Sequence, residues 1–169
     1  MFRIRLISPE RIALPANLYE QLEDPEYYQY LAMTGSRLLE EVGYQFEMNG
    51  FGREWNMDVG YDMSTIVESL PDFIQNFHFG GTGEIDIYSQ GLECTLVFLR
   101  AADMVRIACI SRTKWTPDPA FEVCTLEDLK EMLAGFATDF AHGLHRLSSP
   151  IAQLEPFRSW LTGGVWETL

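Results

Sequence analysis

The sequence predicts an α+β protein in which an antiparallel β-sheet carries helices packed on one face. Three short runs rich in Ile, Val, Phe and Thr between residues 84 and 112 predict a strand meander, and the N-terminal residues alternate as another strand would. Apolar residues at helical spacing follow from residue 126. The 169 residues fit a single domain, 1–169, because a body of this size buries roughly 70% of its unfolded surface.

The first 43 residues predict a strand, a loop and a helix. Residues 2–7 read F-R-I-R-L-I, and this alternation is typical of an amphipathic edge strand. The chain from there to Pro25 is expected to be a loop. Apolar residues at helical spacing from Glu26 predict a helix that ends before Gly43.

A β-hairpin and a further helix are expected next. The run Tyr44–Met48 alternates, Asn49-Gly50 is a strong turn signal, and Trp55–Val59 supplies the returning strand. A helix capped by Asp62 or Ser64 follows, and Pro71 either interrupts it or starts a new turn.

The meander has three predicted strands, at residues 84–89, 92–100 and 104–112. Their short connections, Gln90-Gly91 and residues 101–103, favour antiparallel neighbours. The glycines before the first strand fit a loop that leads into it. They do not form a phosphate loop, because the lysine and the hydroxyl residue of that motif are missing.

Two helices are predicted at the C-terminal end. Residues 125–128, Thr-Leu-Glu-Asp, resemble a capping box, and the apolar spacing after them predicts a long amphipathic helix to about Leu147. A shorter helix restarts at Ser149-Pro150 and closes at Gly163-Gly164.

The formal net charge of -13 predicts which partners the protein binds. Such a field opposes nucleic acid and anionic membrane and favours basic partners, although a merely solvated acidic surface fits the same composition. No Lys or Arg occurs between Glu54 and Leu99. Eight carboxylates fall in that segment: Glu54, Asp58, Asp62, Glu68, Asp72, Glu84, Asp86 and Glu93.

The location expected from the sequence is cytoplasmic. The opening residues have no apolar run of signal-peptide length, and no stretch of about 18 apolar residues occurs. Three cysteines without C-x-x-C spacing indicate reduced thiols rather than a metal or redox site, and no cofactor is expected.

Enzymatic activity is not expected, because no complete catalytic motif is present. Serine candidates lack a G-x-S-x-G sequence, and the cysteines have no helix N-terminus beside them. Asp139, His142 and His145 lie at i, i+3 and i+6 of the long helix, so a small metal-dependent hydrolase remains an alternative function. A non-catalytic adaptor or oligomeric scaffold is the other alternative.

The run IYSQGLECTLVFLRAADMVRIACISRTKW, the helix beginning TLEDLKEML and the tail PIAQLEPFRSWL resemble immunity proteins of bacterial polymorphic toxin systems, of the contact-dependent or type VI/Rhs type. The resemblance covers roughly the C-terminal half. It implies a cytoplasmic protein that binds a cognate toxin domain, often a nuclease, and blocks it without catalysis. A strongly acidic inhibitor also suits the basic cleft of a nuclease.

Charge clustering supplies the candidate contacts to such a toxin. Alternation places Glu84, Asp86 and Tyr88 on one strand face, where they form either a partner-binding surface or simply the solvated face of the sheet. The candidate partner-binding residues are Glu84, Asp86, Glu93, Asp58, Asp62, Trp55 and Tyr88.

Overall fold

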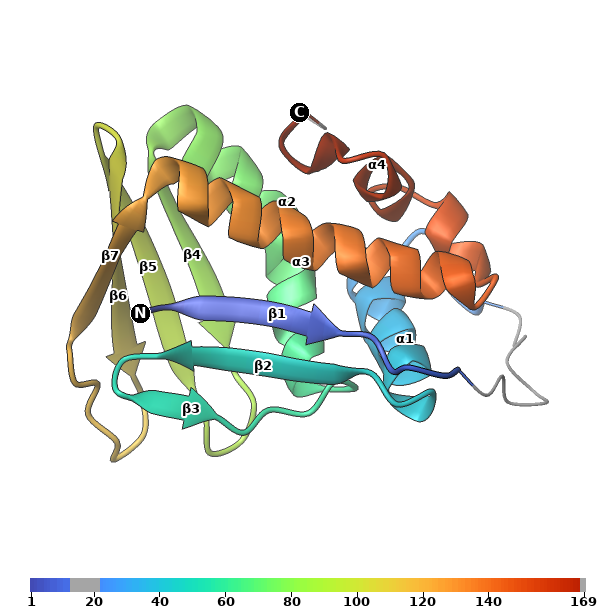
Figure 1. Cartoon of the computed structure of the whole chain (residues 1–169), viewed down its shortest axis with the longest axis horizontal. Coiled ribbons are helices and arrows are strands. Elements are labelled where there is room, and N and C mark those ends of the chain that lie inside the picture. The colour runs from blue at the N-terminus through green and yellow to red at the C-terminus, as the bar shows by residue number, and fades with distance from the viewer. Residues whose placement is uncertain (13–21, 168–169) are drawn as a thin grey trace.

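The computed structural model describes residues 1–12 and 22–167, so part of the loop expected before Pro25 lies outside the described residues. Within these described residues, four α-helices and seven strands in two antiparallel sheets give an α+β architecture, which confirms the predicted fold class (Figure 1). The strands do not form one sheet, however. The N-terminal strands pair among themselves, and the meander forms a second sheet.

The first sheet has the order β1-β2-β3 and contains β1 (Arg3–Ile7), β2 (Gln45–Gly50) and β3 (Arg53–Trp55). The predicted hairpin is present, but its turn is Phe51-Gly52 and not Asn49-Gly50. Phe51 and Gly52 have φ angles of 56° and 81°, as a tight type I′ turn requires. Asn49 and Gly50 pair with β3 instead, so the returning strand ends at Trp55.

The second sheet has the order β4-β5-β6-β7. Its first three strands, β4 (Thr82–Ile87), β5 (Cys94–Ala101) and β6 (Met104–Ser111), confirm the predicted meander. The fourth strand, β7 (Phe121–Thr125), was not predicted. It directly follows a proline-containing loop and leads straight into the next helix, so it lacks the turn signal that would mark the end of a strand.

The helices are α1 (Tyr28–Glu41), α2 (Asp62–Gly80), α3 (Leu126–Arg146) and α4 (Phe157–Leu161), with short 3₁₀ turns at Pro150–Gln153 and Gly164–Trp166. The expected break at Pro71 is wrong, because α2 continues through it. Apolar residues before and after Pro71, including Leu70 and Phe73, are buried on one side of α2, and this packing offsets the lost hydrogen bond.

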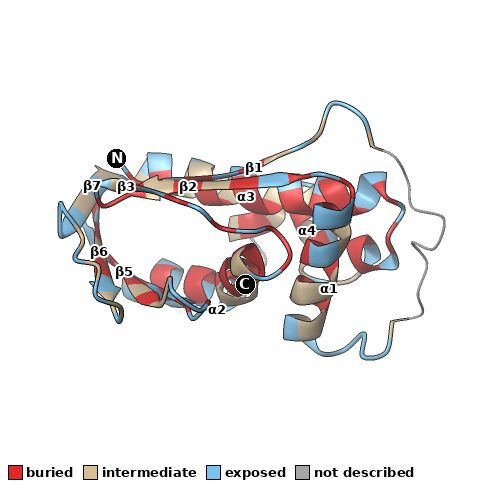
Figure 2. Cartoon of the chain, turned by 90° about the horizontal axis from the view of Figure 1, so that it is seen from below, coloured by how far each residue is buried: buried red, intermediate tan, exposed pale blue. Residues whose placement is uncertain are grey.

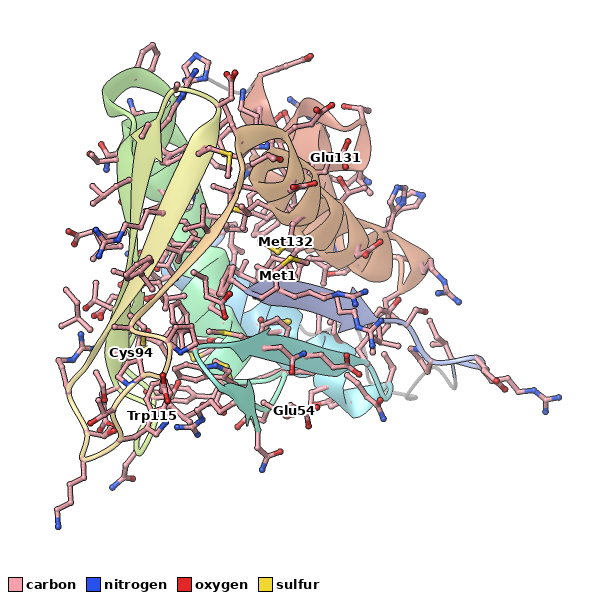
Figure 3. All side chains as sticks on the ribbon, turned by 60° about the vertical axis from the view of Figure 1, so that its left-hand side comes forward. Met1, Glu54, Cys94, Trp115, Glu131 and Met132 are labelled. Carbon is pink, nitrogen blue, oxygen red and sulfur yellow. The ribbon has the colours of Figure 1, made fainter. Side chains whose placement is uncertain are left out.

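The core lies between the two sheets and the helices. Buried residues line the inward sides of the elements in Figure 2, where the second sheet closes one end of the molecule. Helix α2 packs on the inner face of that sheet against β4. Helix α3 lies beside β1, where the Ile4 N–H donates to Met132 Sδ at 3.4 Å, and Figure 3 shows Met132 turned toward the start of β1 near Met1.

Candidate protein-binding surface

The outer face of the second sheet, opposite the core, is the surface that we call the outer sheet face. Side chains alternate along each strand, so every second residue of β4 to β7 points outward. The strand register brings these residues side by side across the sheet. They are Thr82, Glu84 and Asp86 of β4; Thr95, Val97 and Leu99 of β5; Met104, Arg106, Ala108 and Ile110 of β6; and Phe121, Val123 and Thr125 of β7.

The β4 margin of the outer sheet face is acidic, and its two carboxylates differ. Glu84 is exposed and has no hydrogen bond or ion pair within the described part of the chain. Asp86 Oδ1 accepts from Thr95 Oγ1 at 3.2 Å and forms an ion pair with Arg112 at 2.7 Å. Glu84 is therefore the carboxylate of β4 that is free to meet a partner's cation.

The rest of the outer sheet face is mostly apolar and open, with Arg106 among its exposed side chains. Its large apolar side chains remain 43% to 56% exposed: Leu99, Met104, Ile110, Phe121 and Val123. The guanidinium of Arg106 stacks over the Phe121 ring, with its carbon 4.0 Å from the ring centroid. Contiguous exposed apolar side chains beside polar ones are typical of protein interaction sites.

The open edge of β4 adds main-chain groups to this margin. The Arg100 N–H donates to the Gly81 carbonyl at 2.8 Å, and the alternation of an antiparallel ladder then directs the N–H and C=O of Thr82, Glu84 and Asp86 away from β5. A groove of about 860 Å³ runs between this edge and α2, and its lining includes the carboxylates of Asp72 and Glu84.

Three predicted contact residues make hydrogen bonds to nearby backbone N–H groups. Asp58 Oδ1 accepts from the N–H of Tyr61 at 2.6 Å and of Asp62 at 3.0 Å, and Asp62 Oδ2 accepts from the Asp58 N–H at 2.9 Å. This reciprocal pair satisfies N–H groups where α2 begins. Glu93 Oε2 accepts from the Gly91 N–H at 2.9 Å and stabilises the β4–β5 turn.

Trp55 lies in the core, so the prediction that it anchors a partner is not supported by its position. Only 4% of its surface is exposed, and its Nε1–H donates to the Gly50 carbonyl at 3.3 Å. Its ring packs edge-on against Trp115 at 5.1 Å, and the Arg53 guanidinium lies 4.8 Å from both ring centroids. The large apolar ring is buried because β2, β3 and the loop after β6, which carries Trp115, pack around it.

Tyr88 lies just beyond β4 and faces α2 rather than the outer sheet face. Its hydroxyl donates to Glu68 Oε1 at 2.9 Å, and its ring meets Tyr61 edge-on at 6.2 Å. Partial burial raises the pKa of the Glu68 carboxyl, and the hydrogen bond from Tyr88 offsets part of this effect. Burial and the neighbouring carboxylate of Glu68 raise the pKa of the Tyr88 hydroxyl.

The alternative metal-binding residues do not assemble into a ligand set. Among residues 1–12 and 22–167, no group of three or more His, Cys, Asp and Glu side chains is placed to hold a metal ion, so Asp139, His142 and His145 form none. Asp139 lines a separate groove of about 700 Å³ between α3, β1 and β7, where partial burial raises the pKa of its carboxyl.

The cysteines are free thiols with little access to solvent. Cys94 and Cys109 are buried, and Cys124 is half-buried. A hydrogen bond with Cys109 and burial raise the pKa of the Cys94 thiol, and burial raises that of Cys124. These two thiols are therefore poor nucleophiles at neutral pH.

Comparison with family models, with characterised proteins and with solved structures found no match to this chain. None of the helices in the described part of the chain combines the length and apolar character needed to cross a membrane.

Sequence reasoning missed the apolar part of the outer sheet face and the tyrosines around Tyr88. The first was detectable, since C-T-L-V-F-L and V-R-I-A-C-I are nearly continuous apolar runs, whereas a strand with one solvated face alternates strictly. The second left no local signal. Tyr27 and Tyr30 lie together at the start of α1, but Tyr61 and Tyr88 are far from them in sequence and reach them only through the packing of α1, α2 and β4.

Proposed function

We propose that this protein binds a basic protein partner in a stoichiometric, non-catalytic complex through the β4 margin and the outer sheet face. The observation that supports this proposal most directly is the exposed Glu84 carboxylate on an open strand edge, beside a contiguous exposed apolar surface. Apolar burial supplies affinity for such a complex, and the acidic margin selects a cationic partner and speeds its association.

The partner that best fits this proposal is a toxin domain of the nuclease type, held inactive in the cytoplasm by the bound protein. The likeness to immunity proteins suggests the toxin, and the charge of -13 suggests a basic one. A nuclease cleft binds phosphates with cationic side chains, so a carboxylate-bearing strand edge competes for the same groups.

The proposal is tested by capturing the partner with the tagged protein from its native cells and measuring affinity with purified components at several salt concentrations. The expected partner is a single basic polypeptide at one-to-one stoichiometry whose affinity falls as salt rises. The outer-face variant Glu84→Lys/Asp86→Lys is expected to weaken it at least tenfold, because the free carboxylate of Glu84 becomes a repulsive cation and the loss of Asp86 leaves the charge of Arg112 unneutralised beside it.

The matched control is Glu41→Lys/Glu131→Lys, which changes the net charge equally but alters exposed residues on α1 and α3. It is expected to lower the association rate slightly and leave the dissociation rate unchanged. If the two variants weakened the affinity for the partner equally, the effect would come from net charge alone, and the proposed binding surface would be refuted. Failure to capture any basic polypeptide from cells that express the toxin would refute the function.

A further inference from the structure

A small pocket on the α1–α2 side of the molecule is lined by four tyrosines. It has a volume of about 300 Å³, at the lower end of the range of about 300–1,000 Å³ for ligand sites. Tyr27 and Tyr30 come from the start of α1, Tyr61 precedes α2, and Tyr88 follows β4.

Three of the four tyrosines are held in place by contacts that leave ring surface open. Tyr88 donates its hydroxyl proton to Glu68, Tyr30 Oη accepts from the Glu23 N–H at 3.1 Å, and Tyr61 meets Tyr88 edge-on. Tyr27, Tyr61 and Tyr88 nevertheless remain 53%, 45% and 43% exposed. The pocket therefore presents preorganised aromatic surface, which lowers the entropy cost of binding.

Every charged side chain that lines the pocket, within the described residues, is a carboxylate: Glu23, Asp24 and Glu68. Glu68 lies deepest, being half-buried, whereas the other two are exposed at the rim. No Lys or Arg lies between Glu54 and Leu99, so α2 and β4 contribute no cation of their own to the pocket, and Arg112, which follows β6, is paired with Asp86. Such a site repels anions and favours a cation that can stack on the rings.

We propose that this pocket binds an organic cation, specifically the guanidinium or ammonium group of an arginine or lysine side chain on a protein partner. The aromatic faces attract the cation through their quadrupole and pack against its aliphatic stem, while Glu68 supplies the opposing charge. The assignment to a partner's side chain rests on the proposed function. The preference of the pocket for cations does not, because it follows from the lining alone.

Direct binding of a small probe tests the cation preference without any partner. The ¹⁵N-labelled protein is titrated with N-acetyl-arginine amide and with N-acetyl-citrulline amide, which has nearly the same shape without the charge. Saturable amide shifts confined to the residues around Tyr61 and Tyr88 are expected for the arginine probe, and at least tenfold weaker binding for citrulline. Equal binding of both, or shifts elsewhere only, would overturn the proposal.

Three variants test whether the probe binds to the residues that line this pocket. Tyr61→Leu is expected to weaken arginine binding about fivefold, whereas Tyr61→Phe keeps the ring and the affinity. Glu68→Gln keeps an acceptor for Tyr88 but loses the charge, and a loss of about tenfold is expected. Unchanged binding in Tyr61→Leu and Glu68→Gln, with folding checked from amide shift dispersion, would overturn the assignment to this pocket.

Two further experiments decide whether the bound cation is a side chain of the partner or a free small molecule. If the captured partner inserts a basic side chain, Tyr61→Leu weakens its binding and Tyr61→Phe does not. If choline binds at least a hundredfold more tightly than the arginine probe, the pocket serves a free quaternary ammonium compound, and the partner assignment is wrong. A positive arginine titration without any captured partner would refute the proposed function while the cation site stands.

Discussion

Gly83 of β4 allows α2 to approach the sheet, and replacing it by alanine tests this packing. An ideal Cβ at Gly83 would lie 2.6 Å from two ring carbons of Phe73 and 3.3 Å from Phe77 Cβ. Carbon atoms in contact normally lie about 3.5–4.0 Å apart, so the ring must move by about 1 Å. It has no room, because Phe73 is stacked on Phe77 at 5.3 Å and meets Phe98 edge-on at 4.8 Å.

The expected cost combines two opposing effects. Overpacking of this kind destabilises a core by about 1–3 kcal/mol, and alanine recovers about 0.4–1 kcal/mol by restricting the unfolded chain. The free energy of unfolding of Gly83→Ala should therefore fall by about 1–2 kcal/mol, which lowers the melting temperature by roughly 2–8 °C in a chain of this length. Urea titration and thermal melting both measure this change.

The matched control is Gly135→Ala in α3, where an added Cβ meets no atom within 4 Å. This substitution should raise the free energy of unfolding by up to about 1 kcal/mol, because alanine favours a helix interior. Phe73→Leu should reduce the cost of Gly83→Ala, since the ring that clashes is gone. A Gly83→Ala protein as stable as the wild type would refute the close packing of α2 on β4.

Two further predictions concern single side chains. Burial raises the pKa of Glu68, so its cost to folding is absent below the unfolded-state pKa, grows as pH rises toward the folded-state pKa and is complete above it. Glu68→Gln should therefore gain stability relative to the wild type over that pH interval. If the free energies of unfolding of the two proteins, measured by urea titration, changed in parallel with pH, this prediction would be contradicted. Thr125 Oγ1 accepts from the Asp128 N–H at 3.0 Å and donates to Asp128 Oδ2 at 2.6 Å. Thr125→Ala should cost about 1 kcal/mol of unfolding free energy and Thr125→Ser much less, so equal stabilities of the two variants would exclude this cap.

The parts of the fold that were predictable from sequence are those in which neighbouring residues determine structure. The meander and α3 were predicted because turn residues, alternation and a Thr-x-x-Asp cap act within a few residues of one another. The hairpin turn was misplaced because Asn49-Gly50 is the stronger local signal for a tight turn, whereas Phe seldom adopts the positive φ that Phe51 has. Burial of Phe51 and Trp55 in the core selects the second register.

The division into two sheets could not be predicted, because strand alternation says which face is buried but not which strands are neighbours. β1 pairs with β2, about 40 residues away, and α1 lies between them in sequence. Pro71 also misled the prediction, since the local cost of a proline within a helix is outweighed by apolar residues that pack on both sides of it. Both outcomes are decided by tertiary packing.

The acidic segment shows why a cluster of charges in sequence is not itself a binding site. Asp58, Asp62 and Glu93 use their carboxylates to satisfy backbone N–H groups, and Asp86 is paired with Arg112. Their charges still add to the long-range field that attracts a basic partner, since a field depends on total charge. Short-range contact requires a free carboxylate beside apolar surface, and within the segment Glu84 on the outer sheet face combines the two. Reversing the charge of Asp58 would thus test the stability of the start of α2, whereas reversing the charge of Glu84 tests recognition of the partner.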